Sequence, residues 1–312
     1  MRDGPWYGEK GLTDKRDPVA DLALFAVLAI WVASFLVFKV AFHQFLPHAF
    51  NLARFTLMIP LAFATLWFSE GDLRLGRSNL RPMIVSGLLG FGIYQSLFIS
   101  GLARTQASNM ALLLSMTPVF SALILALFRL EAVSRRQWAG IGISMVGVAL
   151  FITKGGSLGE VRFRPGDLMA LGSSACFAAY GILNKPLLTR MTPVRLMAYG
   201  LLIGIVPLVP VSVPDVLRQD WTAIDATGWL LLTYATVFPV YLAYMLWNWA
   251  IARHGVIRTA PVSYLVPVFT GLTAWLFLGE RLTGSQVLAG VVVLAGVGLT
   301  RTGSRSVAEV ET

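Results

Sequence analysis

The chain has 312 residues, of which 56% are hydrophobic and 13% are charged, and its net charge is +9. Soluble domains carry about a quarter charged residues, so this composition excludes an ordinary soluble protein. A membrane span needs about 20 mostly apolar residues, and the length allows roughly ten spans with short connections and no sizeable soluble domain.

Apolar stretches follow one another along the chain, each bounded by charged residues, proline or glycine. Their length and their lack of strict alternation predict helices instead of barrel strands, because backbone polar groups in lipid must be satisfied within the segment. The predicted helices span 21–41, 49–68, 82–103, 108–128, 135–153, 166–185, 193–213, 228–251, 257–278 and 284–300. The sequence therefore predicts an all-α membrane protein with ten transmembrane helices.

Basic residues are unequally distributed over the connections between these helices. The N-terminus, the exits of the even-numbered helices and the C-terminus hold 17 Lys and Arg residues, and the opposite connections hold six. Cytoplasmic connections carry the excess, so both termini are expected in the cytoplasm. The first 20 residues show no apolar stretch with a cleavage site, so no cleavable signal peptide is expected. The basic residues form no single basic face, which argues against a nucleic-acid partner.

The two halves of the chain resemble each other at nearly constant offsets. At an offset of 146 residues, Asp21, Lys39 and Pro47 correspond to Asp167, Lys185 and Pro193. At an offset of 149, Arg104, Pro118, Glu131 and Gln137 correspond to Arg253, Pro267, Glu280 and Gln286. Each half holds an odd number of helices, five, so the second half must enter the membrane upside down, as in the inverted repeats of many transporters.

This repeat divides the chain into expected units. They are a cytoplasmic N-terminal segment at 1–20, a first five-helix repeat at 21–153, a linker at 154–165, a second five-helix repeat at 166–300 and a cytoplasmic tail at 301–312.

Several motifs stand together in this chain. The first helix carries WVASFLVFK at 31–39, the second carries NLARF at 51–55, and each half ends in Pro, an apolar run, Glu, Gln and a Gly-rich helix. In these marks the chain resembles the drug/metabolite transporter superfamily with two EamA-type repeats. The resemblance implies a ten-helix inverted-repeat fold, alternating access, and a central cavity formed mainly by helices 1, 3, 4, 6, 8 and 9. It is strongest to bacterial exporters of aromatic and other neutral amino acids, which implies a multi-pass protein of the bacterial inner membrane.

Polar and aromatic residues of the helices that the resemblance places around the cavity are the candidates for substrate binding. Aromatic walls with a few amides suit an apolar side chain with a polar head group. The alternatives are that the aromatic residues lie at the membrane interface and that the amides serve helix packing. The candidates are Trp31, Ser34, Phe38, Tyr94, Gln95, Phe98, Tyr180, Asn184, Tyr244, Trp247 and Asn248.

Lys39 and Arg54 are unusual cations near the end of the first helix and the start of the second. Both could snorkel to the outer interface, and the alternative is that one meets a substrate carboxylate or gates the outer mouth. Hinges are expected where proline or glycine interrupts a helix, with a static kink as the alternative. The hinge candidates are Gly90, Pro118, Pro239 and Pro267.

Acidic residues lie only in loops or at helix ends, which predicts facilitated transport without a carboxylate-borne proton. Paired carboxylates and metal-binding sets are missing from the helices, and Cys176 has no second cysteine, so no enzyme, metal or cofactor is expected. The sequence thus predicts a transporter that exports small metabolites, most of all amino acids, as a monomer or homodimer in the lipid bilayer. The alternatives are a carrier of another metabolite or drug and, from another class, a membrane-embedded enzyme.

Overall fold

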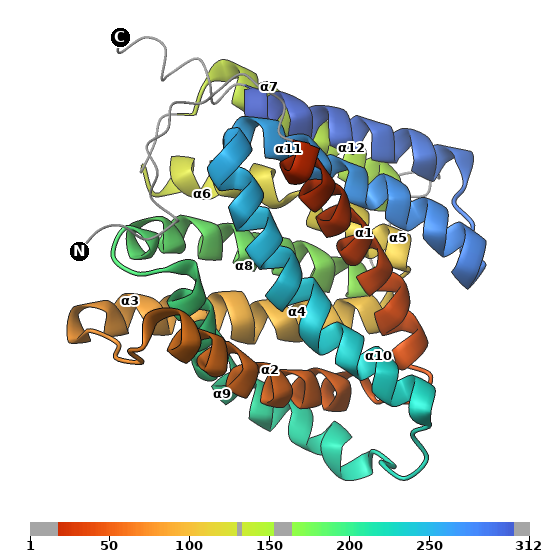
Figure 1. Cartoon of the computed structure of the whole chain (residues 1–312). Coiled ribbons are helices and arrows are strands. Elements are labelled where there is room, and N and C mark those ends of the chain that lie inside the picture. The colour runs from red at the N-terminus through yellow and green to blue at the C-terminus, as the bar shows by residue number, and fades with distance from the viewer. Residues whose placement is uncertain (1–17, 130–132, 153–163, 303–312) are drawn as a thin grey trace.

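The computed structural model describes residues 18–129, 133–152 and 164–302. Within its helices it does not describe the side chains of residues 18, 20, 151–152, 185, 248–249, 251–264 and 301–302. The described chain is helical and contains no strand (Figure 1). Its elements are α1 (Pro18–Ala41), α2 (Pro47–Glu70), α3 (Arg77–Gly87), η1 (Leu88–Ile93), α4 (Tyr94–Arg104), α5 (Ala107–Leu114), α6 (Thr117–Leu127), α7 (Arg135–Ile152), α8 (Pro165–Leu188), α9 (Pro193–Arg218), α10 (Ala226–Thr236), η3 (Val237–Leu242), α11 (Ala243–Leu278) and α12 (Gly284–Thr302).

The predicted all-α fold is confirmed, whereas the number of spans is confirmed only in part. Seven helical runs of the described chain are long and apolar enough to cross a membrane, and two shorter apolar helices, Leu265–Leu278 and Gly284–Thr300, accompany them. The structure assigns helix continuously over Ala243–Leu278, across the connection that the sequence predicted at 252–256. Ten spans and the orientation of the termini therefore stay predictions.

Prolines and glycines mark several helix ends. Pro47, Pro165 and Pro193 occupy the first turn of their helices, where the missing N–H has no intrahelical partner to lose. Gly71 and Gly279 end α2 and α11 in the left-handed conformation, each with a φ of 65°. Glycine adopts this conformation without steric cost, which explains these helix ends.

Gln137 and Gln286, which correspond in the two halves, each form a capping box at the start of a helix. Before α7, the Ser134 hydroxyl accepts from Gln137 N at 3.3 Å, and Gln137 Oε1 accepts from Ser134 N at 2.7 Å. Before α12, Thr283 and Gln286 repeat both hydrogen bonds at 3.3 and 3.1 Å. Each capping box satisfies two backbone donors, so the glutamine serves helix initiation in both halves.

Two short π-helical segments occupy corresponding places in the halves. η1 and η3 each contain six residues, and η3 begins 149 residues after η1. Gly90 lies within η1 and Pro239 within η3, so both hinge candidates coincide with interrupted α-helical pairing. Such π segments are rare and frequently lie at functional sites.

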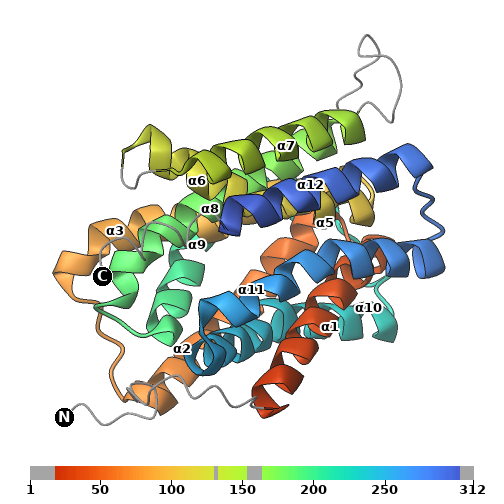
Figure 2. The ribbon, with the colours of Figure 1, turned by 90° about the horizontal axis from the view of Figure 1, so that it is seen from above.

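Contacts between the two halves follow the repeat. α7 lies along its counterpart α12, and α2 contacts its counterpart α9 (Figures 1 and 2). α1 contacts α11, and the counterparts of these two helices, α8 and α4, contact each other in the same way. An added Cβ at Gly140 would come within 2.5 Å of the Thr300 backbone nitrogen, and at Gly296 within 2.5 Å of the Ser144 backbone nitrogen. These small residues let α7 and α12 approach closely within one chain. The oligomeric state stays a prediction.

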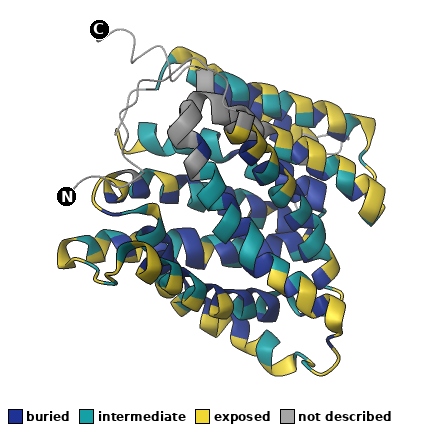
Figure 3. Ribbon diagram, in the orientation of Figure 1, coloured by how far each residue is buried: buried dark blue, intermediate teal, exposed yellow. Residues whose placement is uncertain are grey.

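Burial divides the helices into inner and outer faces (Figure 3). Large apolar side chains such as Phe68 and Leu127 are 87% and 77% exposed on the outside, as expected of surfaces that contact lipid. Polar side chains such as Asn51, Gln95 and Asn184 are buried instead. The polar groups of the helices therefore gather inside the bundle.

Candidate functional site

Arg54 is the centre of the strongest polar cluster inside the bundle. It lies about 10 Å along α2 from the start of that helix, at a rise of about 1.5 Å per residue. Its side chain is 1% exposed. Nη2 donates to Asn51 Oδ1 at 2.9 Å and to Gln95 Oε1 at 2.6 Å. The guanidinium carbon lies 5.0 Å from the centroid of the Phe38 ring and 5.6 Å from that of Phe55.

The burial of Arg54 shows that the snorkelling interpretation was wrong for this residue. A snorkelling side chain keeps its charged end in water, whereas this guanidinium is enclosed by amides and aromatic rings. In the described ranges no carboxylate forms an ion pair with it. Arg54 Nε and Asn51 Nδ2 are buried donors that find no acceptor among the described side chains. The cluster can therefore donate further hydrogen bonds to a ligand and can neutralise a negative charge on it.

Asn51 is a member of this cluster that the sequence analysis did not select. It stands three residues before Arg54 in the NLARF motif, and residues three apart lie on the same side of a helix. The structure confirms this proximity, because the Asn51 amide accepts from the guanidinium. The spacing within the motif was the available signal.

A chain of aromatic rings leads away from Arg54 through α1, α4 and α8. The centroids of Phe38 and Phe98 lie 6.1 Å apart, those of Phe98 and Tyr94 5.9 Å, and those of Tyr94 and Phe177 5.1 Å. Phe177 stacks on Tyr180 at 5.8 Å. Edge-to-face and offset contacts of this kind favour defined ring positions. The structure thus joins four of the predicted binding residues, Phe38, Phe98, Tyr94 and Tyr180, in one chain of ring contacts that begins at the buried cation.

A second aromatic group joins α1 to α11. The Trp31 ring lies 6.2 Å from Tyr244 and 5.3 Å from Trp247, and its indole N–H donates to the Pro239 carbonyl at 3.1 Å. Asn248 belongs to the residues whose side chains the structure does not describe.

Two predicted binding residues have partners elsewhere. The Ser34 hydroxyl donates to the Ile30 carbonyl of its own helix at 2.6 Å, and Asn184 Oδ1 accepts from the Ser86 hydroxyl at 2.5 Å. Both side chains are buried. These hydrogen bonds fit the packing alternative for small hydroxyls and amides, and a binding role of the two residues stays a prediction.

Lys39 belongs to a group of contacts at the junction of α1, α4, α5 and α8. Its Nζ donates to the Thr105 carbonyl at 2.5 Å, and the Thr105 hydroxyl donates to Asp167 Oδ1 at 2.5 Å. Glu280 accepts from the first two backbone N–H groups of α5 at 2.7 and 3.1 Å and from the Ser108 hydroxyl. A cation at a helix C-terminus and a carboxylate at an N-terminus both stabilise the helix dipole. A gating role of Lys39 stays a prediction.

The predicted hinges have different surroundings. An added Cβ at Gly90 would come within 2.1 Å of the Tyr180 ring, so this glycine permits close packing. Pro118 lies in the first turn of α6, because the helix predicted at 108–128 is divided at 115–116 into α5 and α6. The α-helical pairing is thus interrupted beside Pro118, within the single apolar run Ala107–Leu127 that is long enough to cross a membrane. Pro267 lies inside α11. A hinge role of these residues stays a prediction.

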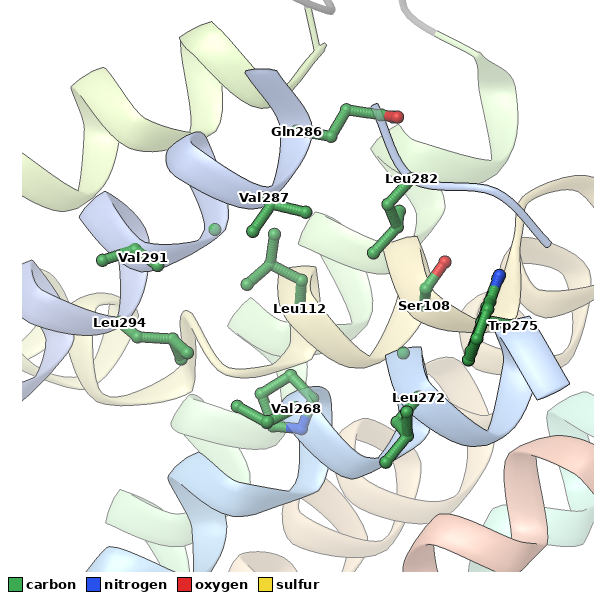
Figure 4. Close-up of a pocket in the computed structure, with 13 residues that line it drawn as sticks. Ser108, Leu112, Val268, Leu272, Trp275, Leu282, Gln286, Val287, Val291 and Leu294 are labelled. Carbon is green, nitrogen blue, oxygen red and sulfur yellow. The ribbon is translucent and has the colours of Figure 1, made fainter. Parts of the chain in front are cut away.

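A groove of about 430 Å³ lies between α5, α11 and α12 (Figure 4). Apolar side chains including Leu112, Val268, Leu272 and Val291 line it, while Ser108, Gln286 and the indole nitrogen of Trp275 carry polar side-chain atoms. Pro267 is the only predicted site residue among its lining residues. In the described part of the chain, no group of three or more His, Cys, Asp or Glu side chains could hold a metal ion. The Arg54 cluster, and not this groove, holds the chemistry that a polar ligand needs.

Comparison with known proteins adds a family and several relatives. The model of the EamA-like transporter family matches the chain twice, over residues 18–153 and 164–302. A crystal structure of another protein superposes with a TM-score of 0.62 at 19% sequence identity, covering 94% of this chain and 99% of that one. This similarity concerns the fold alone.

Three relatives illustrate the proteins that this chain is similar to. The uncharacterized transporter YyaM of Bacillus subtilis is 29% identical, over 87% of this chain and 89% of its own. A probable terminal-alkyne amino-acid exporter of Streptantibioticus cattleyicolor is 28% identical, over 88% and 91%. A probable amino-acid metabolite efflux pump of Salmonella typhimurium is 29% identical, over 87% and 91%.

Proposed function

The chain belongs to the EamA-like transporter family, and we propose that it exports amino acids with aromatic or other apolar side chains. It is a multi-pass membrane protein and a transporter, not an enzyme. Two of its relatives are named as a probable terminal-alkyne amino-acid exporter and a probable amino-acid metabolite efflux pump, which supports a substrate of the amino-acid class. Bacterial relatives fit a location in the inner membrane.

One observation carries the proposal, namely a buried arginine beside aromatic walls. Arg54 offers a buried positive charge, and among the described side chains Arg54 Nε and Asn51 Nδ2 are donors with no acceptor, which suits a carboxylate. The rings of Phe98, Tyr94 and Phe177 continue from this polar end along α4 and α8. An amino acid with an apolar side chain presents these same two parts, a carboxylate and an apolar body.

The proposed transport cycle uses ten spans in two inverted repeats, with both termini in the cytoplasm. Access alternates between the two sides of the membrane as the halves rock around the Arg54 cluster. η1 and η3, with Gly90 and Pro239, are the proposed bending points, because their α-helical pairing is already interrupted. Transport is facilitated, since no carboxylate stands beside Arg54 in the described ranges to carry a coupled proton.

The alternative is a carrier of another metabolite or of a lipophilic drug. The length of the aromatic chain from Phe38 to Tyr180 favours it, because rings bind many apolar bodies. The buried charge of Arg54 argues against a neutral drug, since such a ligand would leave the cation unpaired.

Transport into proteoliposomes tests the proposal. We expect saturable uptake of labelled phenylalanine, tryptophan and methionine, little uptake of glutamate, and equal rates with and without a pH gradient. Arg54→Gln should reduce phenylalanine uptake roughly tenfold or more, because it removes a charge-assisted interaction. Arg136→Gln, at an exposed arginine of α7, is the matched control and should leave uptake unchanged. Absence of amino-acid uptake by the folded wild-type protein would favour the alternative carrier.

A further inference from the structure

Resting on the proposed function, we infer that the site recognises the carboxylate of its cargo and does not recognise the amino group. Monocarboxylates that have an apolar body and no amino group are therefore also cargo. The inference depends on the charges around Arg54 and on the acidic residues that the chain places elsewhere.

Arg54 carries a charge that the described chain leaves unpaired. A guanidinium keeps its proton in proteins, so the cation persists after burial. Arg195 shows the usual solution in this same chain, since its Nη2 lies 2.7 Å from Glu70 and 3.7 Å from Asp72 while the side chain stays 19% exposed. Arg54 is more deeply buried and has only neutral partners. An isolated buried charge is costly, which favours an anion from outside the chain.

The free hydrogen-bond donors of the cluster match a carboxylate. Among the described side chains, Arg54 Nε and Asn51 Nδ2 lack acceptors, while both amide oxygens around the guanidinium already accept from it. Both hydrogens on Nη2 are already donated to Asn51 and Gln95. A carboxylate supplies one negative charge and two acceptor oxygens, which suit the two remaining donors, Arg54 Nε and Asn51 Nδ2. An alcohol or a primary amide in its place would leave the charge unpaired.

The ammonium group of an amino acid has no comparable partner. The acidic residues nearest to the ends of α4 and α5 are occupied, because Asp167 accepts from Thr105 and Glu280 caps α5. The stretch 248–264, whose side chains are not described, contains no Asp or Glu. An ammonium that enters a dry site without a carboxylate gains little to offset its lost hydration. Removal of the amino group should therefore cost little affinity.

Three ligands that share a phenyl ring distinguish recognition of the carboxylate from recognition of the ammonium group. The test measures how unlabelled phenylalanine, 3-phenylpropionate and phenethylamine inhibit counterflow of labelled phenylalanine by the full chain in proteoliposomes. We expect 3-phenylpropionate to inhibit within about threefold of phenylalanine and phenethylamine to be roughly tenfold weaker or worse, the difference that one charge-assisted hydrogen bond makes. Equal inhibition by phenethylamine, which the rings of Trp31, Tyr244 and Trp247 could bind through cation–π contacts, would overturn the inference.

Variants and direct binding measurements distinguish a failure of this inference from a failure of the proposed function. Calorimetric titration of the purified protein with 3-phenylpropionate should show binding that Arg54→Gln removes and Arg136→Gln retains. Arg54→Lys keeps the charge without the fork, and it should bind about tenfold more weakly while remaining folded. Binding of 3-phenylpropionate without any phenylalanine transport would refute the amino-acid exporter and leave the carboxylate site standing. Unchanged binding in folded Arg54→Gln or Arg54→Lys would refute the carboxylate site itself.

Discussion

The two halves of the chain differ most clearly at corresponding positions of α2 and α9. Both helices begin with proline, at Pro47 and Pro193, so Arg54 corresponds to Gly200. At Arg54 a buried guanidinium contacts two amides. At Gly200 an added Cβ would come within 2.4 Å of the Phe91 ring, which fills the space that an arginine side chain would need. The repeat thus preserves the helical frame while only one half supplies the charge, and the site is asymmetric.

The largest expected effect comes from a side chain at Gly200. Gly200→Leu forces its Cβ into the Phe91 ring, and overpacking of this kind costs typically about 1–3 kcal/mol, here near the upper end because the contact is already short. Thermal unfolding of the purified protein measures the loss. The double variant with Phe91→Ala should recover part of it, because the two side chains share one space. Equal losses with and without Phe91→Ala would contradict this packing.

A second prediction concerns α7 and α12, where both halves contribute small residues. Gly296→Val should lower stability by about 1–3 kcal/mol, because its Cβ would come within 2.5 Å of the Ser144 backbone nitrogen. Gly298→Val, two residues further on α12, has no heavy atom within 4 Å of the added Cβ and serves as the matched control. Similar melting temperatures for the two variants would mean that α7 and α12 do not pack this closely in the membrane.

Smaller and nearly equal effects are expected at the two capping boxes. Gln137→Ala and Gln286→Ala each remove a side-chain acceptor from the start of a helix, which costs about 0.5–1 kcal/mol. Because the frame is the same in both halves, the two losses in unfolding free energy should agree within about 0.5 kcal/mol. A difference larger than that would show that the halves diverge in their helix ends as well as in their charge.

The smallest change in stability is expected at Arg54 itself. Arg54→Met removes a costly buried charge and also leaves two amide oxygens without their donor, so the two effects offset each other to within about 1 kcal/mol. Phenylalanine transport should nevertheless be lost. A melting temperature far below that of the wild type would assign Arg54 a structural role. The comparison between α2 and α9 would then concern folding instead of function.

Much of the helical frame could be predicted because its signals are local. Prolines at helix starts and the Ser/Thr-x-x-Gln capping boxes act within a few residues, so the starts of α2, α9 and α12 lie close to their predicted positions. An interruption of the helix predicted at 108–128 was expected at Pro118, but its exact place at 115–116 was not predicted, because the apolar run around it carries no further signal. The role of Glu280 was also missed, since the helix start that it caps lies 172 residues earlier.

For the candidate site, the sequence predicted individual residues but not the contacts between them. Arg54, Gln95 and Phe38 were selected as candidates one by one, yet their mutual contacts join three helices. Asn184 and Ser34 belong to the same residue types, and in the structure they form hydrogen bonds with Ser86 and with the Ile30 carbonyl. Residue type alone does not distinguish these cases.

The sequence by itself determined that this protein is helical, lies in a membrane, repeats its frame and belongs to a transporter family. It also placed Asn51 and Arg54 on one side of α2, because the helical period does so. Only the tertiary structure decided that this side faces inward, against Phe38 and Gln95. The physical reason is that lipid is as apolar as leucine, so apolar residues cover both sides of a membrane helix and their pattern does not reveal which side meets protein.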